Sequence, residues 1–458
     1  MPSGLIIPGV QVTVVKEVLP QQLAPSGILG LVGFTEVGST RVVRAGSWSR
    51  FVELLGRASA YSLPEAKQAL DNGVSELVIS PLPAGSGAPG KVVVPADTTR
   101  RPGNNAGFTL LARAAGTWSN GLLVRVEYRQ NIDPTVFTFD VSVLRSTGGK
   151  EDLLEVHRNL KPEGLAAALR DGSALVKVDE GAALGLPAAG DYLLGAGRDA
   201  TLAQYTAALG RLREESDVDM VIAAVQDFSD RARVASIYGE VISHCNTLSA
   251  ECKGRIGFGQ VPPSSTAAEN VQLASNLVSD RFVLVAPNGV VGAVAGLVGN
   301  LPYHYSPTFK QVSGVGELPP IPVEDQKALL QGKVVPVVLE RGRGTIVLRG
   351  LTTDGDQINV RRVADRAVRT LKMVGDLFIG LLNNADGRTA LRQKLVESLV
   401  QMEKDGAIVP STDGKDPAFK VEVYSSQADF ALGIVRVNMA VRPVRAIDYI
   451  YATITVQV

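Results

Sequence analysis

Short apolar runs alternate with amphipathic stretches through the first and middle parts of the chain. The apolar runs, rich in small and β-branched residues, lie at residues 27–34, 77–79, 220–225, 255–258 and 281–286. The amphipathic stretches, whose apolar residues recur at helical spacing, lie at residues 49–55, 64–71, 205–212, 234–244 and 267–277. Continuous apolar runs of this length are typical of strands buried on both faces, and helices are the usual connections between parallel strands. The pattern therefore predicts an α/β domain.

A different pattern occupies the region between the two α/β stretches. Strand-like runs appear at residues 122–128 and 136–144, and helical periodicity is confined to residues 162–170. The preceding residues 81–90 consist almost entirely of Pro, Gly, Ala and Ser, which is typical of a boundary loop. We therefore predict a β-rich outer insertion at residues 91–200 and a split α/β middle domain at residues 23–90 and 201–345.

The last third of the chain carries the clearest helical periodicity. The first apolar stripe comprises Val363, Ala367, Leu371, Val374, Phe378 and Leu381. The second comprises Leu391, Leu395, Leu399 and Met402 and ends before a glycine. Two amphipathic helices followed by a strand at residues 435–441 are expected, and they define a C-terminal α/β domain at residues 346–445.

Both ends of the chain alternate in the manner of strands. An N-terminal arm is predicted at residues 1–22, where Val10, Val12 and Val14 fall on one side. A C-terminal β-arm is predicted at residues 446–458. Its last ten residues contain no charge and no proline, with Tyr449 and Tyr451 on one side and Ile450, Ile454 and Val456 on the other. Such an unprotected strand pairs either within its own domain or with the sheet of another copy, at roughly 1 kcal/mol per main-chain hydrogen bond.

Composition places the chain among folded globular proteins of mixed α+β class with several domains. It has 458 residues, of which 45% are hydrophobic and 20% charged. Forty-six basic residues balance 46 acidic ones, so no overall field attracts nucleic acid or an anionic membrane. The longest apolar stretch, residues 282–299, is interrupted by a Pro-Asn-Gly turn signal and predicts a buried strand and a small-residue helix rather than a membrane span. The N-terminus lacks the pattern of a secretory signal, and two cysteines cannot build a disulfide framework.

Motifs for catalysis or cofactor binding are not found. The three histidines, His157, His244 and His304, have no metal-ligand spacing, and His244 beside Cys245 and Cys252 matches no zinc motif. No Gly-x-Ser-x-Gly elbow and no P-loop occur. Residues 85–90 read G-S-G-A-P-G, a literal dinucleotide fingerprint, but a strand follows where a helix N-terminus is required. We expect a flexible linker there, and no catalytic residue, cofactor or metal.

One local charge imbalance occurs between residues 341 and 372. This segment contains eight basic residues and three acidic ones. The excess either docks an acidic partner or belongs to a helix face whose partners lie elsewhere in the fold.

Several segments, taken in order, resemble one known family. A Pro-Gly-Val at residues 8–10 precedes G-I-L-G-L-V-G at residues 27–33, and residues 115–124 (A-G-T-W-S-N-G-L-L-V) are similar to an A-x-G-x-W-G-N-x-L-x-V signature, with Ser119 where glycine is usual. An Ala-Gly pair at 295–296 leads to Ser-Pro at 306–307, with Asn300 where aspartate is common. The most specific run covers residues 332–354 and continues as I-N-V-R-R at residues 358–362. Together these segments resemble the tail sheath proteins of contractile phages and related contractile injection systems.

The resemblance implies a structural, non-enzymatic role. Such proteins form hexameric rings stacked as a helical sheath around an inner tube, with the arms adding strands to neighbours' sheets, and contraction drives the tube through a target envelope. Further implied partners are baseplate and tail terminator proteins, with no nucleic acid and no membrane insertion, in a virion assembled in the bacterial cytoplasm. The tube-facing helices expected from the resemblance are residues 359–382 and 388–404. The candidate tube contacts are Arg361, Arg362, Arg366, Arg369, Lys372, Arg388, Arg392 and Lys394.

Two other functions remain open from the residues alone. A cytosolic α/β enzyme of unknown substrate predicts a convergent polar pocket and a discrete oligomer. A non-polymerising tail or baseplate component predicts no self-assembly.

Overall fold

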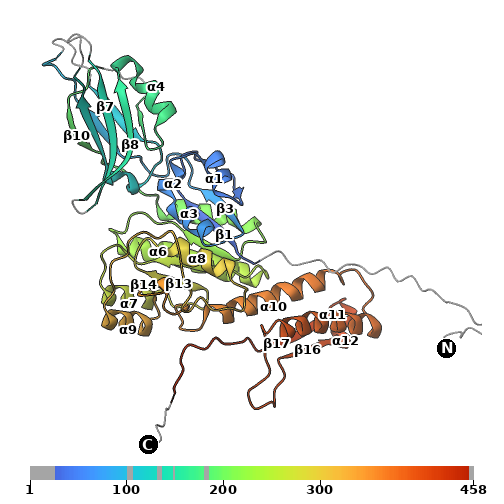
Figure 1. Ribbon diagram of the computed structural model, residues 1–458. Helices are drawn as coiled ribbons and strands as arrows, with labels where there is room; N and C mark the ends of the chain where they lie inside the picture. Colours follow the sequence, from blue (N-terminus) through green and yellow to red (C-terminus); the bar gives the residue numbers. More distant parts are fainter. Residues whose placement is uncertain (1–25, 101–106, 131–136, 148–149, 180–184, 453–458) are drawn as a thin grey trace, which may run out of the picture.

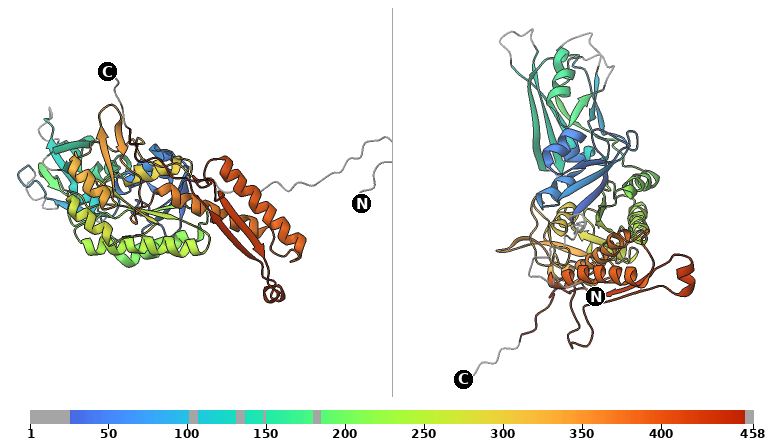
Figure 2. Two further views of the ribbon diagram at one scale, coloured as in Figure 1. Left: turned by 90° about the horizontal axis from the view of Figure 1, so that it is seen from below. Right: turned by 90° about the vertical axis from the view of Figure 1, so that its right-hand side faces the viewer.

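The computed structural model describes residues 26–452 apart from 101–106, 131–136, 148–149 and 180–184. The molecule is elongated, with a β-rich part at one end, an α/β part in the middle and a helical part at the other end (Figures 1 and 2). This arrangement confirms the predicted mixed α/β, multidomain fold.

An eight-stranded sheet organises the middle of the molecule. Its strand order is β15-β14-β13-β12-β11-β1-β3-β2, with parallel pairing from β14 through β3 and antiparallel edge strands. The strands are β1 (Ile28–Gly33), β2 (Val43–Ala45), β3 (Glu76–Pro81), β11 (Met220–Ala223), β12 (Ile256–Gln260), β13 (Phe282–Ala286), β14 (Val335–Glu340) and β15 (Gly344–Val347). Strands β1, β11, β12 and β13 are buried throughout, as their unbroken apolar runs predict.

Helices cover both faces of this sheet. One face packs against α1 (Trp48–Leu55), α3 (Pro64–Asp71) and α8 (Val291–Asn300). The short α2 (Ser59–Ser62) lies between α1 and α3 in the chain, and its Tyr61 packs against the core of the β-rich end. The other face packs against α5 (Leu202–Arg211) with η2 (Leu212–Glu214), α6 (Arg231–Ala250), α7 (Ala267–Ser275) and α9 (Val323–Gln331). The strand and small-residue helix expected at residues 282–299 are β13 and α8. Of the helices described, none is both long and apolar enough to cross a membrane.

The β-rich end of the molecule interrupts the α/β part between β3 and α5. Two small sheets with orders β10-β6-β7-β8 and β4-β5-β9 enclose a separate apolar core with α4. The elements are β4 (Lys91–Val94), β5 (Phe108–Ala112), η1 (Thr117–Gly121), β6 (Leu122–Tyr128), β7 (Phe139–Thr147), β8 (Lys150–Leu160), α4 (Pro162–Gly172), β9 (Val176–Val178) and β10 (Gly190–Leu193). The segment at residues 85–90 leads into strand β4, but the flexible linker expected there is wrong, because Ala88 exchanges two main-chain hydrogen bonds with Arg198 and Gly90 donates to Ser119 Oγ.

The helical end is formed by α10 (Ile358–Asp376) and α11 (Ala385–Lys404) with the hairpin β16 (Phe419–Tyr424) and β17 (Arg436–Val441) and the short α12 (Gln427–Ala431). Both apolar stripes predicted from the sequence meet in one core. The first helix ends earlier than predicted, because Phe378 and Leu381 lie in the turn that follows α10.

Candidate assembly interface

The chain beyond β17 is held against its own protomer for several residues. Val409 donates its N–H to the Arg442 carbonyl, and Val444 donates to the Ala407 carbonyl, both at 3.0 Å. The Asn359 side chain at the start of α10 donates to the Val444 carbonyl at 3.1 Å. These contacts fix the path of the chain from the hairpin toward the N-terminal end of α10.

Asp448 is the last anchor of this segment. Its carboxylate accepts from Arg349 Nε at 2.8 Å and from Gln357 Nε2 at 2.7 Å, and its side chain is only 6% exposed. Gln357, directly before α10, also accepts from the Ala446 N–H at 2.8 Å and donates to the Ala446 carbonyl at 3.0 Å. One amide side chain therefore binds the segment twice and orients Asp448 as well.

The residues after Asp448 leave the protomer. Tyr449, Ile450 and Tyr451 are 63%, 83% and 95% exposed, and over residues 449–452 the chain forms no strand with its own protomer. The guanidinium of Arg349 lies 5.2 Å from the ring of Tyr449. Ile454 and Val456 lie outside the described residues. Three consecutive large apolar residues in water leave an apolar surface without a partner in the described chain.

The N-terminal arm has a buried root. The N–H groups of Gly27 and Ile28 each donate to the carboxylate of Asp219, at 2.9 Å. Burial raises the pKa of Asp219, while Arg362 and Arg369 of α10 and these two N–H groups act in the opposite direction. The start of β1 is therefore fixed beside α10. Val10, Val12 and Val14 lie outside the described residues.

The hairpin β16–β17 has two open edges. Its strands pair antiparallel with Val421 opposite Met439 and Val423 opposite Val437, and these four side chains face α11. Among the residues that the structure describes, no third strand joins this sheet. An isolated hairpin is marginally stable, and open edges present unpaired N–H and C=O groups to other chains. The hairpin is therefore a ready acceptor for added strands.

The basic residues of α10 make contacts within the chain. Arg361 binds Asp280 at 2.8 Å and Asp365 at 3.0 Å. Arg369 donates to the carbonyls of Ser216, Val218 and Gly254 at 2.8–3.0 Å. Arg362 is 6% exposed and donates to the Leu301 carbonyl, and Arg366 lies over the Tyr303 ring. This face of α10 packs on the α/β part. The arginines of α10 therefore have their partners elsewhere in the fold, which was the second alternative for the charge excess.

The remaining candidate tube contacts lie toward the free end of the helical part. Lys372 pairs with Asp376 at 2.5 Å, and Lys394 pairs with Glu397 at 2.8 Å. The other two, Arg388 and Arg392, donate to Asn383 and to the Val421 carbonyl. Lys372 and Arg392 are exposed. Contact of any of the eight residues with a tube stays a prediction.

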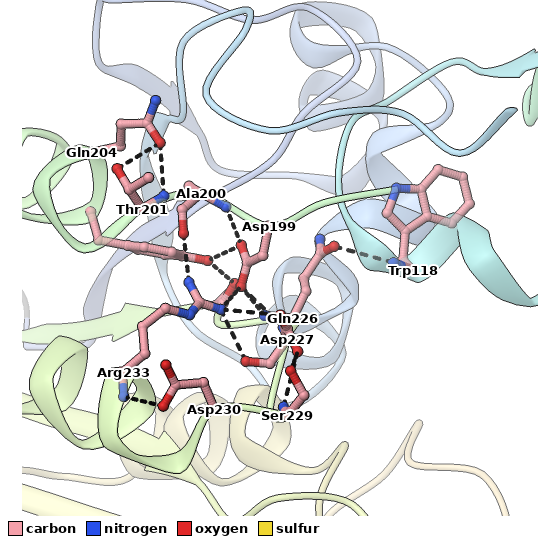
Figure 3. Close-up of polar contacts among 12 residues, drawn as sticks. Trp118, Asp199, Ala200, Thr201, Gln204, Gln226, Asp227, Ser229, Asp230 and Arg233 are labelled. Atoms are coloured by element: carbon pink, nitrogen blue, oxygen red, sulfur yellow. Dashed lines mark hydrogen bonds and ion pairs between the residues drawn. The ribbon is translucent and has the colours of Figure 1, made fainter. Parts of the chain in front are cut away.

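A dense polar cluster lies where α/β proteins usually bind ligands, beyond the carboxyl ends of the parallel strands (Figure 3). The Asp199 carboxylate is 2% exposed and accepts from Ala200 N, Gln226 N, Asp227 N and Arg233 Nη2 at 2.7–3.1 Å. It also accepts from the hydroxyl of Tyr205 at 2.9 Å. Both carboxylate oxygens therefore accept hydrogen bonds from groups of the chain itself.

The cluster joins the β-rich insertion to the α/β part. Gln226 accepts from the N–H of Trp118 in the insertion at 3.3 Å and donates to the Ser62 carbonyl at 2.7 Å. A second contact between the two parts is the hydrogen bond from Arg113 Nε to Glu36 Oε1, at 2.7 Å. These contacts join the insertion to the α/β part through side chains of both.

The histidine and cysteine pair singled out by the sequence is also packed inside the fold. Arg255 lies 2.9 Å from His244 Nε2, and burial and this cation lower the pKa of His244 to about 4. Cys245 is buried, which raises the pKa of its thiol to about 12. Within the described residues, no group of three His, Cys, Asp or Glu side chains has the geometry to hold a metal ion.

Sequence reasoning missed the anchoring residues Asp448, Gln357, Arg349 and Asp219. The only signal was that Asp448 is the last charge before an uncharged tail. Contacts between residues about 90 to 190 positions apart leave no periodicity in a single sequence.

Comparisons with known proteins agree with this architecture. Residues 352–457 match the family of phage tail sheath C-terminal domains. Among solved structures, the sheath tail protein of Listeria innocua has a TM-score of 0.53 at 16% identity, covering 93% of both chains. The anti-feeding prophage helical sheath in the contracted state has 0.55 at 13%, covering 99% of both. The sheath complex of the extracellular contractile injection system PVC, also contracted, has 0.57 at 12%, covering 99% of this chain and 98% of that one. Comparison with curated protein sequences returns no match.

The structural likenesses extend over nearly the whole chain, so they include the β-rich insertion as well as the region matched by the family model. Residues 352–457 are thus similar to the phage tail sheath C-terminal domain family, and the chain as a whole has the fold of tail sheath proteins from phages and contractile injection systems.

Proposed function

We propose that this chain is the structural protomer of a contractile sheath, with no catalytic role. Copies assemble as hexameric rings stacked helically around an inner tube, and contraction drives the tube through a target cell envelope. The observation that carries the proposal is the C-terminal arm, which is clamped at Asp448 and exposes a run of apolar residues immediately afterwards.

The open hairpin β16–β17 of a neighbouring copy is the acceptor for the arms. The protomer's own hairpin is a poor acceptor for its own C-terminal arm, because the contacts of Gln357 and Arg349 hold the chain at the N-terminal end of α10. Residues 449–458 comprise ten residues and span about 33 Å when extended. Strand addition therefore links separate protomers, and its main-chain hydrogen bonds accumulate to several kcal/mol at each junction.

The inner tube lies against the helical end of the molecule. Because four arginines of α10 are engaged with the α/β part, the tube contacts concentrate on Lys372, Arg388, Arg392 and Lys394. The β-rich insertion lies at the opposite end of the molecule (Figure 1). In the proposed sheath this end faces outward. Baseplate and terminator proteins cap the two ends of the sheath, in a particle assembled in the bacterial cytoplasm.

Electron microscopy of the purified full chain tests the proposal. Tubes or stacked rings are expected, and residues 1–448 without the arm tip should remain folded monomers. The far-ultraviolet circular dichroism and thermal midpoint of the truncated chain provide the folding control. Compact particles from the full chain at high concentration would contradict the proposal.

A further inference from the structure

A small cavity lies between α10 and the amino ends of the parallel strands, at the opposite edge of the sheet from the Asp199 cluster. Its volume is about 50 Å³. The strand side is lined by Ser26 before β1, Asp219 before β11 and Gly254 before β12. A space of this size accommodates a few water molecules or one small ion, and it excludes nucleotides and other large ligands.

Three arginines of α10 line the helix side of this cavity. Arg362, Arg366 and Arg369 recur at intervals of four and three residues, so they lie on one face of the helix. Arg362 is 6% exposed, and its Nη1 donates to the Leu301 carbonyl at 3.2 Å. Its Nη2 is buried and has no hydrogen-bond acceptor among the described residues, and the same holds for Arg369 Nε. Two of these arginines therefore each have a buried donor without a partner in the described chain, which is unusual in a folded protein.

The carboxylates that line the cavity do not balance these arginines. Asp217 is bound by Arg44 at 2.7 Å, and Asp365 is bound by Arg281 at 3.0 Å. Asp219 remains, and its carboxylate accepts from two backbone N–H groups. Three guanidinium groups thus share the space with one further carboxylate. Because an uncompensated buried charge is costly, this arrangement favours an anionic ligand.

The titration of the side chains around the cavity agrees with an excess of positive charge. Burial lowers the pKa of Arg362; Asp219 opposes this effect and Arg366 adds to it. Burial raises the pKa of Asp219, which favours the neutral form of the one carboxylate that could offset the guanidinium groups. A ligand that brings both negative charge and acceptor oxygens therefore fits the cavity.

We propose that this cavity binds one tetrahedral oxyanion, phosphate or sulfate, through the guanidinium groups of Arg362, Arg366 and Arg369. Its oxygens accept from Arg362 Nη2 and Arg369 Nε, and such charge-assisted hydrogen bonds are among the strongest in proteins. The bound anion ties α10 to Ser26 at the root of β1. This inference goes beyond the proposed function, because it applies to a single protomer whether or not copies assemble.

Equilibrium dialysis of the full chain against radiolabelled phosphate tests the site directly. At neutral pH and constant ionic strength, maintained with sodium chloride, we expect saturable uptake of one phosphate per chain with a dissociation constant below about 1 mM. Unlabelled sulfate should displace the label, and acetate at the same concentration should not. Uptake that does not saturate, or displacement by acetate as readily as by sulfate, would overturn the assignment.

Two substitutions in the same helix separate this cavity from a general attraction to basic residues. Arg362→Gln should weaken phosphate binding at least about tenfold. Lys372→Gln removes the same charge, but Lys372 pairs with Asp376 outside the cavity, so binding should change less than about twofold. Near-ultraviolet circular dichroism verifies that both variants are folded. Equal weakening by the two substitutions, or full binding by a folded Arg362→Gln chain, would contradict the proposal.

A measurement on the unchanged chain keeps the proposal testable if Arg362→Gln does not fold. The N–H groups of Gly27 and Ile28 donate to Asp219 beside the cavity. Phosphate should slow their hydrogen–deuterium exchange at least about threefold relative to chloride at equal ionic strength, with the amides of α11 unchanged. Identical exchange in the two salts would overturn the site. Neither failure affects sheath assembly, which electron microscopy tests separately.

Discussion

Removing the Asp448 carboxylate should release the root of the C-terminal arm. The substitution Asp448→Ala leaves Arg349 Nε and Gln357 Nε2 without the acceptor that they reach at 2.8 and 2.7 Å. Hydrogen bonds to a charged group contribute about 1.5–3 kcal/mol each. Because the Arg349 side chain is 25% exposed, solvent compensates part of this loss. We therefore expect Asp448→Ala to weaken the anchoring of the segment by about 2–3 kcal/mol.

That free energy concerns local opening of the segment rather than global unfolding. It corresponds to a roughly 30- to 150-fold increase in the opening constant. Hydrogen–deuterium exchange of the Ala446 N–H, which donates to Gln357 Oε1, reports this opening directly. We expect its exchange to accelerate by a factor in this range, with the exchange of α11 amides unchanged.

A neighbouring ion pair provides the control. Arg445 pairs with Asp356 at 2.7 Å, but its side chain is 66% exposed, so Arg445→Ala should change the exchange of the segment less than fivefold. Equal acceleration by both substitutions, or none by Asp448→Ala, would refute the anchoring role of Asp448.

Three further predictions concern stability. Asp365→Ala leaves Arg281 buried without its partner at 3.0 Å, so the free energy of unfolding in urea should fall by about 3–5 kcal/mol, against less than about 1 kcal/mol for the exposed Asp376→Ala. Burial raises the pKa of Glu65 to about 7, so the folded chain retains a proton that the unfolded chain releases. The free energy of unfolding should therefore fall by about 3 kcal/mol as the pH rises from 4.5 through 7, and Glu65→Gln should abolish this fall; an unchanged pH profile would contradict it. Gly116 has φ +115° and abuts a glutamine side chain across the joint with the insertion, so Gly116→Ala should destabilise the joint by about 2 kcal/mol, seen as faster proteolysis between the two parts.

Local sequence patterns predict much of the fold. The unbroken apolar runs at β1, β11 and β13 and the stripes of α10 and α11 identify their elements because burial is repeated at each turn or residue. The sequence predicts too late an end for α10. Phe378 and Leu381 continue its apolar stripe although they lie in the turn after the helix.

The long-range polar contacts could not be predicted from local sequence patterns. The charge excess near α10 is visible in the sequence, but its partners include Asp280 and the carbonyls near Val218, about 80 and 150 residues away. Pairing at such distances follows from the tertiary fold and not from spacing. Asp448 and Gln357 were missed for the same reason, whereas the alternation of the C-terminal arm is a local pattern, and its strand stays a prediction.

The central claim is that the arms belong to sheets of neighbouring copies. A cryo-electron microscopy map of the assembled full chain, in which residues 449–458 can be traced, tests it most directly. We predict density that runs from Asp448 to the β16–β17 hairpin of an adjacent protomer. Density that turns back onto the same protomer, with no strand crossing between copies, would contradict the account.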